Sequence, residues 1–270
     1  MFQTIINSKA ELFDIVQQVR SHRLKVMLST GQIVCEMYRG QGRNIWRLEP
    51  TIIRNIKDVN EIKKIEIQLI NDFHQMLVKY NLSNHIQSGF LKGKFHSDWL
   101  LIQQAQHYGI PTRFMDWTIN WEVALFFAVA NPADDDYDAD FWIYIVQPED
   151  LELDNHLTTY YDFSPYSFDK SIFLNAAGYL SDDYLSKIAM RRVARQNGRF
   201  FIQPYNLLSV PLEENASHQK YLHRVTIPRE IKEDLRSELS RFNYTSEGMY
   251  IITEPLIENI KYDLRKKYGV

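Results

Sequence analysis

The sequence predicts a single domain of the α+β class over residues 1–270, with a mixed or antiparallel sheet and several packed helices. Helical and strand-like segments follow one another without the regular alternation of parallel α/β folds. No internal repeat occurs, and no long Gly, Ser or Pro linker divides the chain. Within this domain we expect a helical lead-in at residues 1–30, a core at 31–254 and a C-terminal helix at 255–270.

The first half of the chain carries the clearest helical signals. Ser8 and Glu11 form a capping box at the start of an amphipathic helix. A strand is expected over residues 32–38, ending in a turn at 39–42. Asp98 and Asn120 are expected to cap two later helices. The second of these, at 121–130, has no polar face and is expected to be buried on all sides. The remaining helices of this half are expected over 61–80 and 98–108.

The second half begins with an acidic run at residues 134–140, which we interpret as a solvated connection. A strand is expected over 141–146 and a helix with a basic face over 181–196, closed by Gly198. Further strands are expected over 199–203, 221–227 and 249–252, with a helix over 228–242 and a basic C-terminal helix.

Composition excludes several classes of protein. The chain has 45% hydrophobic and 24% charged residues, as ordinary globular domains do. No apolar stretch approaches the length of about 18 residues that a spanning helix requires, and residues 1–20 do not read as a signal peptide. One cysteine, Cys35, permits no intrachain disulfide and no Cys-based zinc site. A net charge of −3 argues against a generic polyanion binder. We therefore expect a cytoplasmic protein with no membrane association.

Familiar catalytic motifs are missing from the sequence, including the GxxxxGK loop, GxGxxG after a strand, GxSxG and HExxH. Polar residues instead gather in three segments. The first is Tyr38-Arg39-Gly40-Gln41, where a guanidinium offers a planar fork of donors to phosphate or carboxylate and Gly40 would let a ligand approach the backbone. The alternative is a solvated arginine in a surface ion pair.

The second polar segment, residues 106–118, joins a helix end to the buried helix. One interpretation is a ligand shelf at the N-terminus of that helix, where anions are favoured. The other is an internally satisfied loop in which Arg113 pairs with Asp116. The candidate residues of this segment are Gln106, His107, Tyr108, Gly109, Thr112, Arg113, Asp116, Trp117 and Thr118.

The third polar segment contains Arg191, Arg192, Arg195 and Gln196, followed by residues 197–200. A solvated basic face near a helix C-terminus accounts for it, and contact with phosphates is the alternative.

Together these segments resemble the FRG domain family. The resemblance rests on three blocks that span about residues 33–252. They are residues 38–41 with Trp46, Leu48, Pro50 and Arg54; residues 106–113 and 116–118 with 124–128; and residues 196–200 with 225–228.

The layout of these blocks also looks like that of ADP-ribosyltransferases of the Arg-Ser-Glu type, which implies a split sheet. Arg39-Gly40 matches the first element, and Thr112 or Thr118 stands at the second. Gln196 falls where those enzymes carry a late Glu. Because Gln is neutral, the resemblance implies that Asp116 or Glu122 supplies the missing charge, or that NAD is bound without turnover.

The resemblance implies a protein that uses NAD as substrate, transferring ADP-ribose or cleaving NAD, in a bacterial toxin or antiviral defence effector. Arg39 would hold a phosphate or ribose, and His107 and Tyr108 the nicotinamide end. Asp116 would orient Arg113 or contact the ribose, and Gln196 would contact its 2′-hydroxyl. No metal is expected. The implied catalytic residues are Arg39, His107, Asp116 and Gln196; the implied ligand-binding residues are Tyr38, Gly40, Gln41, Gln106, Tyr108, Gly109, Thr112, Arg113, Trp117 and Thr118.

Two alternatives stay open. A non-catalytic module could bind a nucleotide or nucleic acid through Arg191, Arg192, Arg195 and Arg199, with Phe200 and Phe201 as stacking surfaces. A metal-dependent nuclease built on His107 and Asp116 is the other. The acceptor and the oligomeric state are left undetermined by the sequence.

Overall fold

The computed structural model describes residues 2–31, 35–54, 56, 58–80, 94–146, 162–175, 195–249 and 255–270. Seven strands form one sheet: β1 (Phe2–Ile5), β2 (Cys35–Gln41), β3 (Phe114–Thr118), β4 (Ala139–Val146), β5 (Ile172–Asn175), β6 (Gly198–Ile202) and β7 (Leu222–Ile227). The longer helices are α1 (Lys9–Thr30), α2 (Val59–Lys79), α3 (His96–His107), α4 (Trp121–Val129), α7 (Lys232–Arg241) and α9 (Pro255–Tyr268). Two short helices are α6 (Ala216–Gln219) and α8 (Ser246–Met249).

The sheet has the strand order β1-β7-β4-β2-β3-β6-β5 and is mostly antiparallel, with β1 and β7 as its parallel pair. The predicted α+β class is therefore confirmed. Side chains alternate along the sheet as expected for a period of two. Phe141 and Ile143 of β4 pack with α4, whereas Trp142 and Tyr144 pack on the opposite face.

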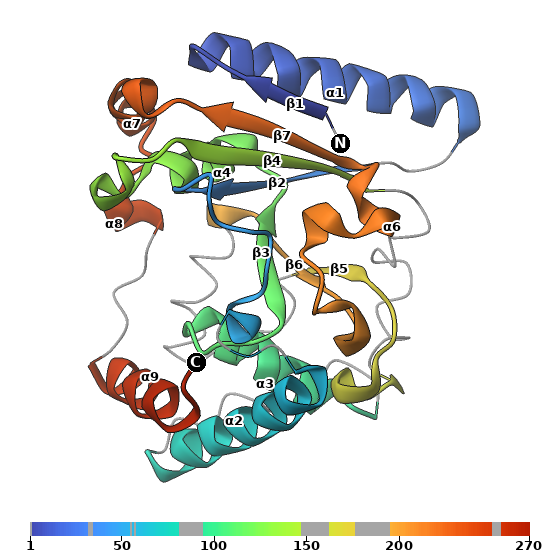
Figure 1. The fold of residues 1–270 in the computed structure, drawn as a ribbon, viewed down its shortest axis with the longest axis vertical. Coiled ribbons are helices and arrows are strands. Elements are labelled where there is room, and N and C mark those ends of the chain that lie inside the picture. The colour runs from blue at the N-terminus through green and yellow to red at the C-terminus, as the bar shows by residue number, and fades with distance from the viewer. Residues whose placement is uncertain are drawn as a thin grey trace.

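The sheet forks between β2 and β3. These neighbours are joined in register at one residue pair, Tyr38 and Thr118, whereas β2 and β4 are paired from Cys35 to Gln41. Figure 1 shows β3 and β6 running steeply across the direction of β4 and β7. Beyond the Tyr38–Thr118 pair, the two strands diverge and leave a crevice in the sheet.

Helix α4 forms one wall of this crevice and packs tightly on β2. Gly40 makes the close approach possible, because a Cβ at this position would lie 1.9 Å from the Ala124 carbonyl oxygen. Gly40 is therefore needed for the packing of β2 against α4, and the approach of a ligand to its backbone stays a prediction.

A second layer of helices covers the β3–β6 part of the sheet. Helices α2, α3 and α9 lie together below β3 in Figure 1 and share a core with residues of β3 and β6. Trp99 of α3 is completely buried there and donates its indole N–H to the Phe163 carbonyl oxygen at 2.9 Å. This core fixes the α3 end from which His107 extends.

Several predicted boundaries change. Strand β2 continues through Arg39 to Gln41, where a turn was expected, and the segment expected as a connection contains β3. Helix α3 begins at His96, so Asp98 lies in its first turn. Met249 ends helix α8 and does not begin a strand. The expected helix at 181–196 and strand at 249–252 lie mostly outside the described residues.

The acidic run is also more ordered than a solvated connection. Asp134 is 4% exposed and pairs with Arg43, with 2.6 Å between Oδ1 and Nε. The buried ammonium of Lys232 donates to the carbonyl oxygens of Gly42, Asp134 and Tyr137. No helix in the described part of the chain has the length and apolar character needed to cross a membrane.

Candidate functional site

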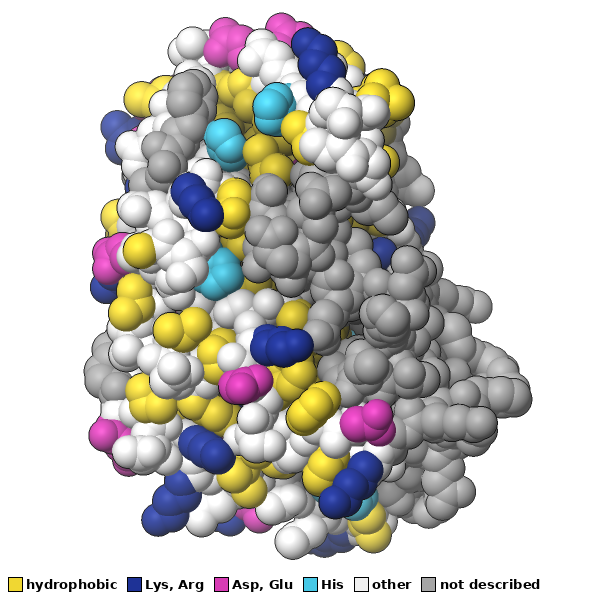
Figure 2. Space-filling view, turned by 90° about the vertical axis from the view of Figure 1, so that its right-hand side faces the viewer, with side chains coloured by type: hydrophobic (Ala, Val, Ile, Leu, Met, Phe, Trp, Pro, Cys, Tyr) yellow, Lys and Arg dark blue, Asp and Glu magenta, His cyan; other side chains and the backbone are white. Residues whose placement is uncertain are grey.

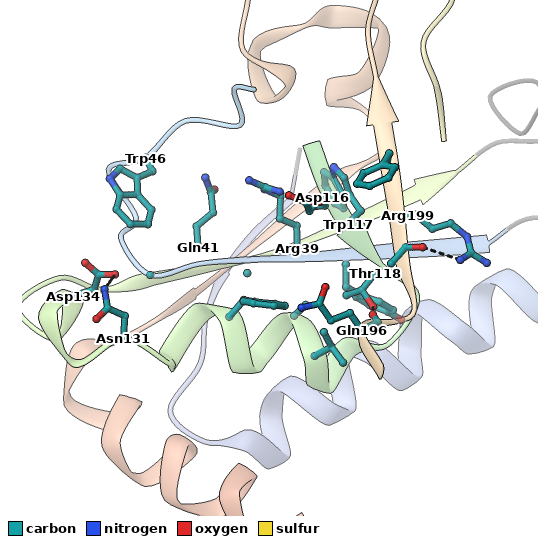
Figure 3. Close-up of a pocket in the computed structure, with 18 of the residues that line it drawn as sticks. Arg39, Gln41, Trp46, Asp116, Trp117, Thr118, Asn131, Asp134, Gln196 and Arg199 are labelled. Atoms are coloured by element: carbon teal, nitrogen blue, oxygen red, sulfur yellow. Dashed lines mark hydrogen bonds between the residues drawn. The ribbon is translucent and has the colours of Figure 1, made fainter. Parts of the chain in front are cut away.

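A pocket of about 340 Å³ occupies the crevice where β2 and β3 diverge. It brings together the four residues that the sequence suggests for catalysis, Arg39, His107, Asp116 and Gln196, although they come from four separate parts of the chain. Figure 3 shows three of them, Arg39, Asp116 and Gln196. Val123, Ala124 and Phe127 of α4 complete the pocket, and a ligand shelf at the N-terminus of this helix stays a prediction. Other residues that line the pocket include Gln41, Trp46, Arg54, Asn131, Asp134 and Arg199.

Arg39 bridges the fork. Its Nη1 donates a hydrogen bond to the backbone carbonyl oxygen of Asp116, across the gap where sheet pairing stops. Its Nε is buried and has no hydrogen-bond partner among the described residues. Burial lowers the pKa of Arg39, the Asp116 charge opposes that shift, and the nearby Arg54 charge adds to it. Arg39 is thus a desolvated cation with donor capacity beside the pocket.

Asp116 is the exposed residue of β3, and its carboxylate is oriented by a short hydrogen-bond chain. The hydroxyl of Thr112 donates to Gln106 Oε1 at 2.7 Å, which leaves the Gln106 amide to donate to Asp116 Oδ2 at 2.8 Å. Gln106 and Thr112 do not line the pocket. They orient the Asp116 carboxylate from outside the pocket.

The opposite wall is formed where the chain enters β6. Thr118 donates its hydroxyl proton to the Gln196 carbonyl oxygen at 2.5 Å, and the Gln196 amide donates to the Met249 carbonyl oxygen at 2.8 Å. The His107 ring lies 5.2 Å from the Phe200 ring. Of the two acids considered as a source of negative charge, Asp116 lines the pocket. Glu122 lies elsewhere, paired with Lys9 and Tyr244.

Arg113 has a different environment from the one predicted. Its side chain is completely buried, with Nε 3.3 Å from Glu66 Oε2, and it donates to the carbonyl oxygens of Gln203 and Pro165. Its guanidinium carbon lies 4.2 Å from the centre of the Tyr205 ring. The expected pairing of Arg113 with Asp116 is wrong, because a carboxylate from α2 occupies that role.

Two further predicted residues lie outside the pocket. Tyr108 packs against Phe73, with 6.1 Å between ring centres. Gly109 adopts a φ of 74° directly after α3, and its carbonyl oxygen accepts a hydrogen bond from Arg265. These two residues follow the end of α3 and attach it to its neighbours, Tyr108 to α2 and Gly109 to α9. Tyr38, Gly40, Gln41, Trp117 and Thr118 do line the pocket.

Sequence reasoning gave no role to four other lining residues, Trp46, Arg54, Asn131 and Asp134. The first two appear above only as marks of the family resemblance. Asp134 belongs to the acidic run, and its ion pair with Arg43 depends on contacts far apart in sequence. The sequence around Asp134 is acidic throughout, so it does not indicate that this one aspartate is buried.

The arginines of the third polar segment do not form a shared basic surface within the described residues. Arg191 and Arg192 lie outside the described residues, whereas Arg199 lines the pocket and donates to the Gly198 carbonyl oxygen at 2.9 Å. On the described part of the face in Figure 2, Lys and Arg side chains stand singly among acidic, polar and hydrophobic ones. No cluster of three metal-ligating side chains occurs among the described residues.

The chain thus forms an α+β fold with a pocket at a fork in its sheet. Residues 36–137 match the model of the FRG domain family. The match runs from the second residue of β2 through α2, α3, β3 and α4, and so covers Arg39, His107 and Asp116. No curated protein and no solved structure matches the chain. The likeness to ADP-ribosyltransferases stays a prediction from the order of the motifs.

Proposed function

We propose that the pocket binds NAD and that the protein transfers its ADP-ribose group or hydrolyses it. The observation that supports this function is the convergence of Arg39, His107, Asp116 and Gln196 on one pocket. At about 340 Å³ the pocket is at the small end of the usual range for ligand sites. It suits one half of a dinucleotide, with the other half extending toward its mouth.

In the proposed reaction the bond between the ribose C1′ and the nicotinamide nitrogen breaks. Nicotinamide leaves as a neutral molecule with the bonding electrons, and an acceptor, either water or a nucleophilic group, adds to C1′ and loses its proton. The positive charge that develops on the ribose is stabilised by preplaced negative charge. Asp116 supplies that charge, while Arg39 holds a phosphate and Gln196 contacts the 2′-hydroxyl.

The test follows free nicotinamide after the purified protein is incubated with NAD. Asp116→Asn removes the charge but keeps an oxygen that can accept the Gln106 hydrogen bond, so we expect release to fall by about 100-fold or more. Arg39→Ala should weaken binding. The matched control is Asp14→Asn, an exposed acid on α1, which should release nicotinamide at the wild-type rate.

Two results would separate the alternatives. A thermal shift with NAD but no nicotinamide release would leave a non-catalytic nucleotide-binding module. The absence of both would remove the proposal.

A further inference from the structure

Trp46 stands at the end of the pocket away from Arg199, with Gln41 and Arg39 between it and Asp116 (Figure 3). It is 42% exposed, whereas the other four tryptophans, Trp99, Trp117, Trp121 and Trp142, are at most 8% exposed. A large aromatic ring that lines a pocket and remains open to solvent is suited to stacking on a ligand ring.

The indole is held in place from one side. The guanidinium carbon of Arg43 lies 5.4 Å from the centre of the Trp46 ring and 4.6 Å from that of Tyr137. Arg43 is itself fixed by the ion pair with Asp134, whose backbone is held by the buried Lys232. A ring that is ordered before binding loses little side-chain entropy when a ligand stacks on it.

The polar side chains beside Trp46 are already bonded to protein atoms. Gln41 accepts from the Trp142 indole at 2.8 Å and donates to the Arg47 carbonyl oxygen at 3.1 Å. Asn131 accepts from the Ala133 amide and donates to Asp134 Oδ2. The aromatic plane is therefore the main feature that this end offers to a ligand.

Two arginines that line the pocket between its two ends favour an anion there. Arg54 lines the pocket and is close enough to Arg39 to lower its pKa, and burial also lowers the pKa of Arg54. Arg54 is exposed and the Glu49 charge partly offsets its own, but the two guanidinium groups still repel, and a bound phosphate would relieve this repulsion while accepting their hydrogen bonds.

We propose that Trp46 stacks on the base of the bound nucleotide, next to phosphate held by Arg39 and Arg54. The proposal rests on the proposed function for its premise that a nucleotide enters this pocket. Recognition by stacking tolerates different bases, because each base has a π face. The site is accordingly selective for an aromatic ring joined to phosphate and tolerant of the identity of that ring.

The experiment uses AMP, GMP and ADP-ribose as probes and ribose 5-phosphate as the ligand without a ring. Acrylamide quenching of tryptophan fluorescence reports mainly on Trp46, since the other tryptophans are buried. We expect the three nucleotides to protect Trp46 from quenching. Trp46→Ala should weaken their binding by about 5- to 150-fold, the range typical of base stacking on an aromatic side chain.

Three controls define the effect. Trp46→Phe should retain most of the affinity, and Tyr262→Ala, which removes an exposed ring on α9, should change nothing. Binding of ribose 5-phosphate should be the same in wild type and Trp46→Ala.

The outcomes distinguish this proposal from the function on which it rests. Nucleotides that bind Trp46→Ala as tightly as wild type, or that leave Trp46 open to quenching, overturn the stacking subsite but not NAD binding that depends on Arg39. Binding of AMP that requires Trp46, without any binding of NAD, supports the subsite and removes the proposed function. No binding of any nucleotide overturns both.

Discussion

Arg39 and Arg113 both belong to the polar segments of the sequence and both were expected to bind a ligand, but their surroundings in the fold differ. Arg113 is completely buried against Glu66, two carbonyl oxygens and the Tyr205 ring. Arg39 donates a hydrogen bond to one carbonyl oxygen, that of Asp116, and forms no ion pair among the described residues. Its neighbour Arg54 carries the same charge.

The difference lies in the counter-charge. A buried cation with a carboxylate and carbonyl partners inside the protein contributes to the fold, and removing one partner is costly. A desolvated cation beside a pocket, with a second cation near it, gains most from an anion supplied from outside. Arg113 is accordingly a structural residue, and Arg39 is the candidate for ligand binding.

The largest expected effect tests Arg113. Arg113→Met leaves Glu66 buried without its counter-charge and should lower the free energy of unfolding by about 3–5 kcal/mol. Urea denaturation measures the loss. The control is Lys267→Met, which breaks a more exposed pair with Asp72 and should cost about 1 kcal/mol or less. Equal losses in the two variants would contradict the assignment of Arg113 to the fold.

Lys232 provides a second buried cation for the comparison. Burial lowers its pKa, and its ammonium donates to three backbone carbonyl oxygens beside the Trp46 end of the pocket. Lys232→Met removes this donor from all three oxygens, although the Asp134 oxygen still accepts the Tyr137 amide, and it should lower the free energy of unfolding in urea by about 1–3 kcal/mol. Because Asp134 then loses a constraint, nucleotide protection of Trp46 should also weaken. A stable variant with unchanged Trp46 quenching would show that the lysine does not shape the pocket.

His218 shows a third way to bury a basic group, which is to keep it neutral. It is 4% exposed, its Nδ1 lies 2.7 Å from the Tyr144 hydroxyl, and burial lowers its pKa from 6.5 to about 4. The unfolded chain therefore takes up this proton before the folded chain does. The stability from neutral His218 is complete above pH 6.5 and is lost as the pH falls toward 4.

Denaturation at pH 7 and pH 5 measures this contribution. Wild type should lose about 2 kcal/mol more than His218→Gln between these two values. His22→Gln, which changes an exposed histidine on α1, should keep the wild-type pH dependence. Parallel curves for wild type and His218→Gln would mean that His218 does not remain neutral in the folded protein.

Much of the helical framework could be predicted from local sequence. Asn120 caps α4 as expected, and its side chain accepts a hydrogen bond from the Glu122 amide. Ser8 likewise accepts from the Glu11 amide at the start of α1. Both signals act within three residues, so they do not depend on the rest of the fold. The uninterrupted apolar run of α4 also correctly predicted burial.

The fork and its chemistry depend on contacts that local patterns do not carry. Strand β3 was missed because Phe114, Met115 and Trp117 are buried on both faces of the sheet, which removes the polar alternation of a half-exposed strand. Glu66 lies in an ordinary helical pattern, and only tertiary packing brings it to Arg113. The four catalytic candidates line one pocket, whereas their catalytic roles stay predictions.

The smallest expected change in stability and the sharpest test of the comparison both belong to Arg39. Arg39→Ala removes one hydrogen bond across the fork, but it also removes a desolvated charge next to Arg54, so unfolding should become easier by about 1 kcal/mol or less. Inorganic pyrophosphate should raise the melting temperature of wild type, because a ligand that binds only the folded state stabilises it. This rise should disappear in Arg39→Ala and persist in Arg113→Met despite its lower starting stability. If pyrophosphate stabilises Arg39→Ala as much as wild type, the anion binds elsewhere. The two arginines would then differ only in the hydrogen-bond and charge partners that the protein gives them.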